Sequence, residues 1–133
     1  MVDIVAEDLK LKARNYFLLG TVAERLGMTS ESASNWFKAL FALDDYALSL
    51  KLGKVPKDHT ERFIMLKASS PVLYEITDRV FSTYRRTYTQ NLRPEELLLV
   101  KKRLMEAFEN AKVAAPTDEE IKNKLKELVK KGA

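Results

Sequence analysis

Glycine and proline are scarce in this chain, and they fall largely where one helical apolar repeat stops and the next begins. The 133 residues include four of each. Between these breaks, apolar residues return every three or four positions, which is the period of a helix that buries one face. No segment alternates apolar and polar residues as a half-buried strand does. The sequence therefore predicts an all-α fold.

Capping residues and breaks divide the chain into six predicted helices. Thr29 or Ser30, Asp58 and Ser70 are candidate caps, and Thr117 with Glu120 forms a capping box. The joins are short, which favours antiparallel neighbours in an up-down bundle. The predicted helices span about 3–26, 29–52, 58–68, 71–90, 94–113 and 117–131.

We expect residues 1–115 to form a bundle of four to five helices and residues 116–133 to form an appended amphipathic helix. The apolar stripe of that last helix is narrow, so the helix can pack on the bundle or on a second chain. The stripe consists of Ile121, Leu125, Leu128 and Val129.

Composition excludes several classes of protein. Cysteine is absent, which leaves no disulfide framework and no thiolate metal site. His59 is the single histidine, so a zinc site would need carboxylates for nearly all its other ligands. No apolar run approaches the roughly 20 residues of a membrane span, and residues 1–10 carry acids where a secretory signal has a basic start. We expect a cytoplasmic protein without a membrane segment, a metal or another cofactor.

Residues 78–91 combine arginine and tyrosine on one predicted helix. Three guanidinium groups and two phenols in such a segment can hold phosphate and stack on bases. A solvated basic face with both tyrosines half in the core is the plainer interpretation. The residues are Arg79, Arg85, Arg86, Tyr84 and Tyr88.

The arginines and Tyr84 of this segment lie on different faces of the predicted helix. Arg79 and Arg86 are seven positions apart and share a helix face, whereas Tyr84 lies about 140° around the helix from Arg79. Arg79 and Tyr84 can therefore meet one ligand only across a groove or a dimer seam. The formal charge of +4 permits an acidic partner without requiring one.

Two further polar residues stand where they need an explanation. Asp44 falls in the apolar stripe of the second helix, where burying an unpaired carboxylate is costly. Either Asp44 lies at an edge of the stripe in water, or Asp44 or Asp45 pairs with Arg79. His59 begins the third helix, where it is structural or solvated, or else a hydrogen-bonding group at the mouth of a groove.

From about residue 13 to residue 111, the chain resembles the HEPN family of small helical domains. The matching segments are ARNYFLLG, then NWFKALFALDDYALSLKLG, then the join from Gly53 to His59 with its Pro-Lys-x-His sequence, then Arg79 to Tyr84, and then RPEELLLVKKRLMEAF. In family members that are ribonucleases, an arginine and a histidine a few residues later meet their copies across a homodimer groove. Tyr84 stands at the histidine position, so the chain resembles the branch of the family with tyrosine there.

The resemblance implies a homodimer that binds a nucleotide or RNA, with weak or no catalysis, because a phenol with a pKa near 10 is a poor base at pH 7. We therefore assign no catalytic residue. Two alternatives stay open: an interaction module that partners a minimal nucleotidyltransferase in a toxin–antitoxin-like pair, and a metal-independent ribonuclease that uses Arg79 with Tyr84 or His59. The candidate ligand-binding residues are Arg79, Tyr84, Arg85, Arg86, Asp44 and His59.

Overall fold

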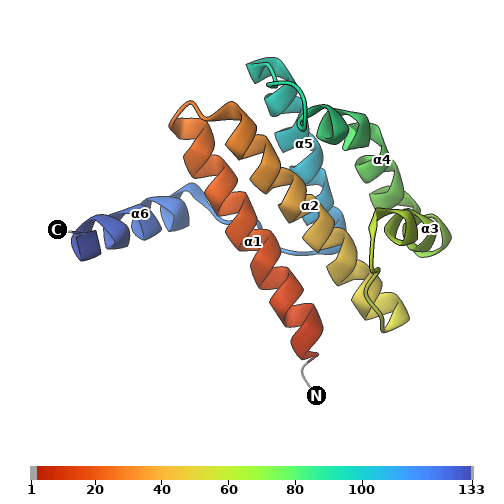
Figure 1. The fold of residues 1–133 in the computed structure, drawn as a ribbon. Coiled ribbons are helices and arrows are strands. Elements are labelled where there is room, and N and C mark those ends of the chain that lie inside the picture. Colours follow the sequence, from red (N-terminus) through yellow and green to blue (C-terminus); the bar gives the residue numbers. More distant parts are fainter. Residues whose placement is uncertain (1–2, 133) are drawn as a thin grey trace.

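A computed structural model describes residues 3–132 of the chain, and it confirms the all-α fold (Figure 1). No strand occurs within those residues. The helices are α1 (Ile4–Arg25), α2 (Thr29–Leu52), α3 (His59–Ser69), α4 (Pro71–Arg86), α5 (Pro94–Ala111) and α6 (Asp118–Gly132).

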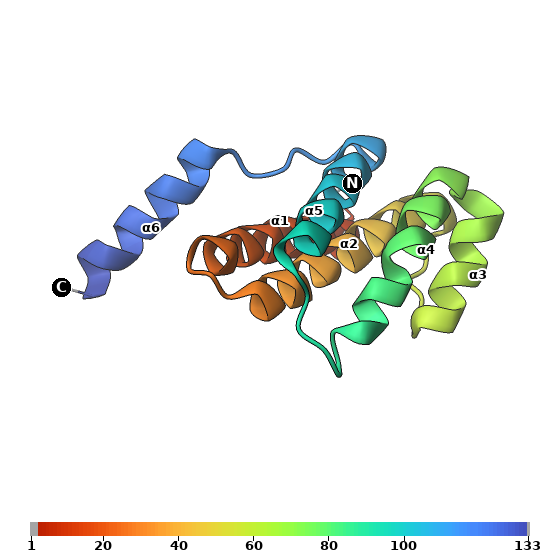
Figure 2. The ribbon, with the colours of Figure 1, turned by 90° about the horizontal axis from the view of Figure 1, so that it is seen from above.

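The long helices α1, α2, α4 and α5 alternate in direction, and α2 lies at the centre of the bundle (Figure 1). Helix α2 packs against α1, α5, α3 and α4. The short helix α3 lies beside α4 on the side of α2 away from α1 (Figures 1 and 2). Helix α6 points away from the bundle. Over the described part of the chain, no helix is both long and apolar enough to cross a membrane.

The α1–α2 hairpin is fixed by a close contact between backbone and ring. Trp36 is fully buried, and its ring nitrogen donates a hydrogen bond of 3.2 Å to the carbonyl of Phe17. A Cβ atom built on Gly20 would overlap the indole ring of Trp36. Glycine at this position therefore allows the two helices to approach closely.

Several predicted helix ends are confirmed. Asp58 caps α3 by accepting a 2.8 Å hydrogen bond from the backbone N–H of Glu61. Thr117 and Glu120 form the expected reciprocal pair of hydrogen bonds before α6. Gly27 and Gly53 follow α1 and α2 with positive φ angles, as helix-ending glycines do.

Two predicted caps are wrong, although both helices begin at the predicted residues. Helix α2 begins at Thr29 without a side-chain cap, and Ser30 instead donates a 2.7 Å hydrogen bond to Asn91. The hydroxyl of Ser70 caps nothing and is buried without a partner. Proline at the first position of α4 supplies the helical φ in its place.

Two helices end earlier than predicted. Helix α4 stops at Arg86 and not near residue 90, because the hydroxyl of Thr87 bonds to the carbonyl of Tyr84 and the backbone tightens into a turn. Helix α5 stops at Ala111 because Lys112 adopts a left-handed conformation with φ of 59°. Val113 then donates to the carbonyl of Phe108, which closes the helix end.

The first turn of α6 anchors that helix to α1. Arg14 makes two hydrogen bonds of 3.0 and 2.8 Å to Glu120, and Arg25 pairs with Asp118 at 3.0 Å. Ile121 is buried and Leu125 is half-buried. Leu128 and Val129 complete the predicted apolar stripe, and their side chains are not among those that the structure describes.

Candidate functional site

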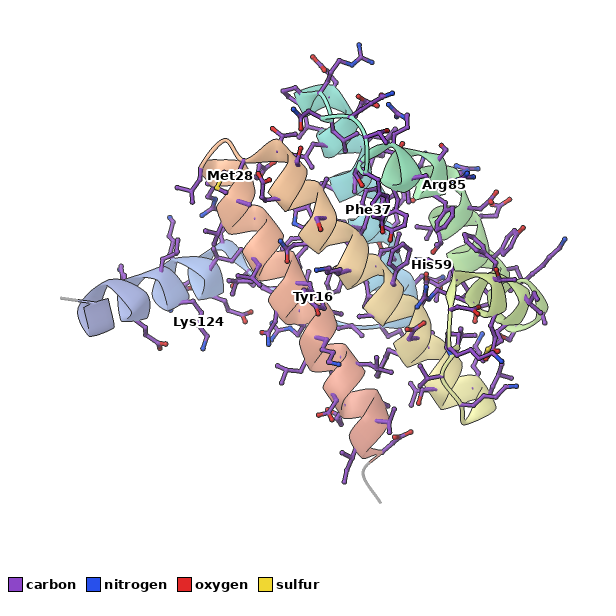
Figure 3. All side chains as sticks on the ribbon, in the orientation of Figure 1. Tyr16, Met28, Phe37, His59, Arg85 and Lys124 are labelled. Atoms are coloured by element: carbon purple, nitrogen blue, oxygen red, sulfur yellow. The ribbon has the colours of Figure 1, made fainter. Side chains whose placement is uncertain are left out.

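His59 lies at the first position of α3, where the cap made by Asp58 sets the direction of the helix. Its ring is half-buried between α2 and the α3–α4 pair (Figure 3). The ring centroids of Phe41, Phe81 and Tyr84 lie 4.7, 5.3 and 5.4 Å from that of His59, all with steeply inclined planes. Three helices therefore hold the imidazole in one place.

A buried ion pair lies behind His59. Arg62 donates hydrogen bonds of 2.8 and 3.0 Å to the two carboxylate oxygens of Asp45, and both residues are more than nine-tenths buried. The remaining guanidinium nitrogen lies 2.6 Å from Nδ1 of His59. Arginine can only donate, so Nδ1 accepts this bond. The proton of the neutral ring is thereby placed on Nε2, which faces Tyr84.

The electrostatics keep His59 neutral. Desolvation, followed by the nearby charge of Arg62, lowers the pKa of His59 below its ordinary value of 6.5. Asp45 and Asp58 oppose this shift without cancelling it. At pH 7 the ring is therefore a neutral hydrogen-bond donor at Nε2.

Tyr84 faces Nε2 of His59 with its hydroxyl oxygen 3.4 Å away. The same hydroxyl is 2.6 Å from the hydroxyl of Tyr88, which lies just beyond the end of α4. The Tyr84 ring packs on Phe37 and Phe41 at centroid distances of 5.2 and 5.0 Å. Desolvation and the hydrogen bond with Tyr88 raise the pKa of Tyr84 to about 12.

These side chains open into a cavity of about 270 Å³, which we call the His59 pocket. Its wall contains aromatic rings and no acidic side chain, and its only charged side chain is that of Lys38. Serine and threonine hydroxyls complete the polar part of the wall. The lining residues are Ser30, Ser34, Lys38, Phe41, His59, Tyr84, Thr87 and Tyr88.

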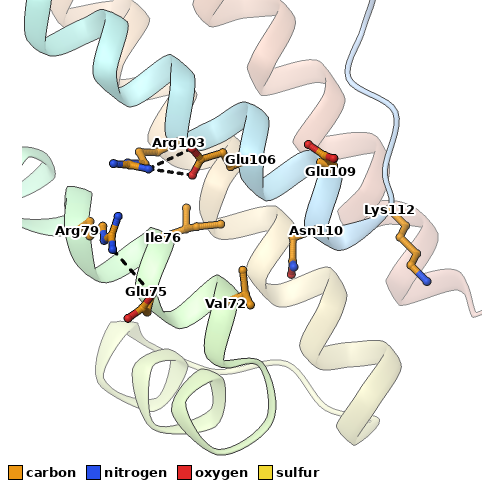
Figure 4. Close-up of a pocket in the computed structure, with 9 residues that line it drawn as sticks. All are labelled: Val72, Glu75, Ile76, Arg79, Arg103, Glu106, Glu109, Asn110 and Lys112. Carbon is orange, nitrogen blue, oxygen red and sulfur yellow. Dashed lines mark hydrogen bonds and ion pairs between the residues drawn. The ribbon is translucent and has the colours of Figure 1, made fainter.

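The structure separates Arg79 from this pocket. Arg79 lines another cavity of about 520 Å³ between α4 and α5, which also contains Arg103 (Figure 4). Each arginine has an acidic neighbour on its own helix: Glu75 lies 4.0 Å from Arg79, and Glu106 lies 3.0 Å from Arg103. The cavity is therefore of mixed charge, and Arg79 and Tyr84 do not share a site within one chain.

The predicted pairing of Asp44 or Asp45 with Arg79 is wrong. Asp45 pairs with Arg62, and Asp44 accepts a 2.6 Å hydrogen bond from the hydroxyl of Thr77. Asp44 does not lie at a wet edge either, because it is fully buried and its second carboxylate oxygen has no partner. Burial raises the pKa of Asp44 well above its ordinary value, so a protonated carboxyl fits this position.

The two adjacent arginines of α4 have different surroundings. Arg86 pairs with Glu96 at the start of α5, and this bond lowers the pKa of that carboxyl. Arg85 is exposed, points outward in Figure 3, and makes no ion pair with any residue from 3 to 132. Both arginines line a shallow hollow with Ser82 and Thr89, outside the His59 pocket.

Sequence reasoning missed Arg62, Lys38 and Thr77. Arg62 carried a usable signal, because it follows His59 by three positions and so lies on the same face of a helix. Its pairing with Asp45 depends on how α3 packs against α2, which the local sequence does not specify. His59 and Tyr84 were both singled out, but the contact between them was not predicted.

Comparisons with known proteins add no assignment: no protein-family model matches the chain, and neither the curated proteins nor the solved structures yielded a match. No cluster of three or more acidic or histidine side chains suited to a metal ion occurs among residues 3–132.

Proposed function

We propose that this chain is a HEPN-like domain that binds a nucleotide or single-stranded RNA in the His59 pocket and holds it without cleaving it. The observation that carries the proposal is the wall of this pocket, where aromatic rings, hydroxyls and one lysine meet and no acid is present. Bases stack on aromatic rings, and phosphates take hydrogen bonds from hydroxyls and cations.

Each group of side chains in the pocket wall has a role in this proposal. Tyr88 is 74% exposed and held by its hydroxyl to Tyr84, so its ring offers a stacking surface at the mouth. Lys38 is exposed on α2 and supplies the positive charge for a phosphate. The hydroxyl of Ser34 can donate to a phosphate or sugar oxygen. The cavity volume is close to the lower end of ordinary ligand pockets, roughly 300 Å³, which suits one nucleotide unit better than a larger ligand.

Binding is favoured over cleavage because neither candidate proton carrier is suited to acid–base chemistry near pH 7. Nδ1 of His59 accepts from Arg62, so its other nitrogen holds the proton and cannot act as a base without losing that arrangement. The pKa of Tyr84 is raised to about 12, which is too far from neutrality for efficient proton transfer.

A binding titration tests the proposal. The probe is a fluorescently labelled single-stranded RNA of mixed sequence, with AMP as a competitor. We expect Tyr88→Ala to weaken binding about fivefold or more, because stacking contributes about 1–3 kcal/mol per base. Lys38→Ala should weaken binding and lower its salt dependence by about one unit of log–log slope.

The matched control is Lys54→Ala, which removes an exposed lysine from the loop between α2 and α3 outside the pocket. It should leave binding nearly unchanged. Equal losses for Lys38→Ala and Lys54→Ala would show that the chain attracts RNA only through its overall charge. Cleavage of the RNA by the unaltered chain in the presence of EDTA would replace this proposal with the ribonuclease alternative.

A further inference from the structure

Helix α1 has a second apolar face that the described structure leaves uncovered. One face packs on α2, and the opposite face exposes several large apolar side chains to solvent. Leu18 and Val22 lie on this outer face and are half-buried. The exposed members are Ile4, Leu11, Leu19 and Leu26, with 73, 56, 52 and 70% of their surface accessible.

The spacing of these residues is that of a helix–helix seam. At 100° per residue, all six fall within a sector of about 100°, centred near Asn15 and opposite the face that packs on α2. Ile4, Leu11 and Leu18 recur every seven positions, as residues of a pairing helix do. Helix α1 has 22 residues and is about 33 Å long, which is enough for a seam of several turns.

The outer face is complementary to itself when two copies run antiparallel. Ile4 and Leu26 lie eleven positions before and after Asn15, and Leu11 and Leu19 lie four positions before and after it. A two-fold axis through Asn15 therefore places Ile4 against Leu26 of the partner subunit and Leu11 against Leu19 of the partner subunit. Such matching is what an isologous interface requires.

The polar residues of α1 fit the same arrangement. Asn15 is exposed and falls on the axis, where two amides can hydrogen-bond to each other and fix the register, as a single asparagine does in coiled coils. The first two turns carry Asp3, Glu7 and Asp8, and the last turn carries Arg25. Antiparallel pairing places these acids beside the last turn of the second helix, where Glu24 and Arg25 sum to no net charge, whereas parallel pairing would place them beside each other.

Helix α6 leaves room for this second helix. After its anchored first turn, α6 diverges from the bundle (Figure 2). A cavity of about 380 Å³ lies between the two helices, with Leu11, Asn15 and Leu18 on the α1 side and Lys124 and Glu127 on the α6 side. The outer face of α1 therefore forms one wall of this cavity, and α6 forms the other.

We propose that a second copy of this chain docks on the outer face of α1, with the two α1 helices antiparallel about a two-fold axis at Asn15. The proposal is independent of the function proposed for the His59 pocket. It differs from the shared-groove dimer that the family resemblance implies, because the partner contributes nothing to the pocket.

The first test is the mass in solution by sedimentation equilibrium at micromolar concentration. We expect about 30 kDa, twice the 15.2 kDa of one chain. Leu11→Glu and Leu19→Lys should each give a 15.2 kDa species with an unchanged far-ultraviolet circular dichroism spectrum, because both positions are exposed in the single chain. Ile64→Glu, at an equally exposed position on α3, is the matched control and should leave the dimer intact.

The register is tested by mixing the two variants. In the proposed pairing, a mixture of Leu11→Glu and Leu19→Lys chains forms a heterodimer with one Glu–Lys contact and one intact leucine contact. A mixture that stays monomeric would overturn the register, and a monomeric unaltered chain would overturn the interface.

Disulfide cross-linking tests the axis, since the chain contains no cysteine to interfere. Asn15→Cys should cross-link two chains on mild oxidation, because a residue on the axis meets its own copy within disulfide reach. Leu26→Cys should not, because its two copies lie at opposite ends of the seam. Equal cross-linking of both variants would indicate parallel pairing or random collision and would overturn the proposal.

Discussion

At the scale of single residues, Arg62 determines the chemistry of the site. It bonds both oxygens of Asp45 and still reaches Nδ1 of His59 at 2.6 Å. The fixed positive charge of Arg62 beside Nδ1 opposes protonation of the imidazole. Removing only one member of a buried ion pair commonly costs about 3–5 kcal/mol, so this effect is best measured with Arg62 and Asp45 altered together.

We predict that His59 titrates below 6.5 in the folded chain. Because His59 is the single histidine, one ring-proton resonance in an NMR titration reports it directly. The variant Arg62→Met/Asp45→Asn should raise the pKa toward its ordinary value, since the lowering effect of Arg62 exceeds the raising effect of Asp45. A pKa at or above 6.5 in the unaltered chain would contradict the bond between Arg62 and Nδ1.

The same shift sets the sign of a pH effect on stability. Below 6.5 the unfolded chain binds a proton at His59 more readily than the folded chain does, so the unfolding free energy falls as the pH drops from about 6.5 through the folded-state pKa. Asp44 acts in the opposite direction. Its raised pKa means that the folded chain binds the extra proton, so the stability from Asp44 is lost as the pH rises above 3.8 through its folded-state pKa.

At the scale of helices, the sequence predicted most of the fold because local signals end most of these helices. Asp58 and the pair Thr117 and Glu120 act within one turn, so their roles are visible in the sequence. The early end of α4 was missed because Thr87 can continue a helix or bond to the preceding carbonyl, and its surroundings decide between the two.

The site was less predictable than the helices because its contacts depend on how whole helices pack. His59 and Tyr84 were chosen by residue type, but their contact depends on the packing of α3 and α4 on α2. The partner of Asp45 had to be selected from several arginines, and the choice of Arg62 over Arg79 follows from the positions of whole helices. Periodicity specifies which face of a helix is buried and leaves its neighbour undetermined.

The α1–α2 hairpin provides the prediction at this scale. Gly20→Ala should destabilise the chain, although alanine is the better helix former by roughly 1 kcal/mol. The added methyl would overlap the buried ring of Trp36, and overpacking of a core commonly costs about 1–3 kcal/mol. Urea denaturation measures the net effect. Ser82→Ala, at an exposed position of α4, is the control and should change stability by no more than about 0.5 kcal/mol.

At the scale of the whole molecule, α2 separates the two surfaces to which we assign functions. The outer face of α1 points away from α2, and the His59 pocket lies between α2 and the α3–α4 pair (Figures 1 and 3). A dimer formed through α1 therefore carries two pockets that are far from the axis and open to solvent. Each pocket is complete within one chain, because α2, α3, α4 and the turn after α4 supply its whole wall.

This arrangement predicts that dimerisation and ligand binding are independent. Isothermal titration of the unaltered chain with the single-stranded RNA probe should give one equivalent site per chain without cooperativity. The Leu11→Glu monomer should bind with the same affinity within about twofold, because Leu11 does not line the pocket and coupling requires a state that both sites bias. Tyr88→Ala should show the converse pattern, with weaker binding and an intact dimer of about 30 kDa. If Leu11→Glu abolished binding while its fold and the monomer mass were as expected, the pocket would need both chains. The shared groove of the family resemblance would then replace two separate pockets.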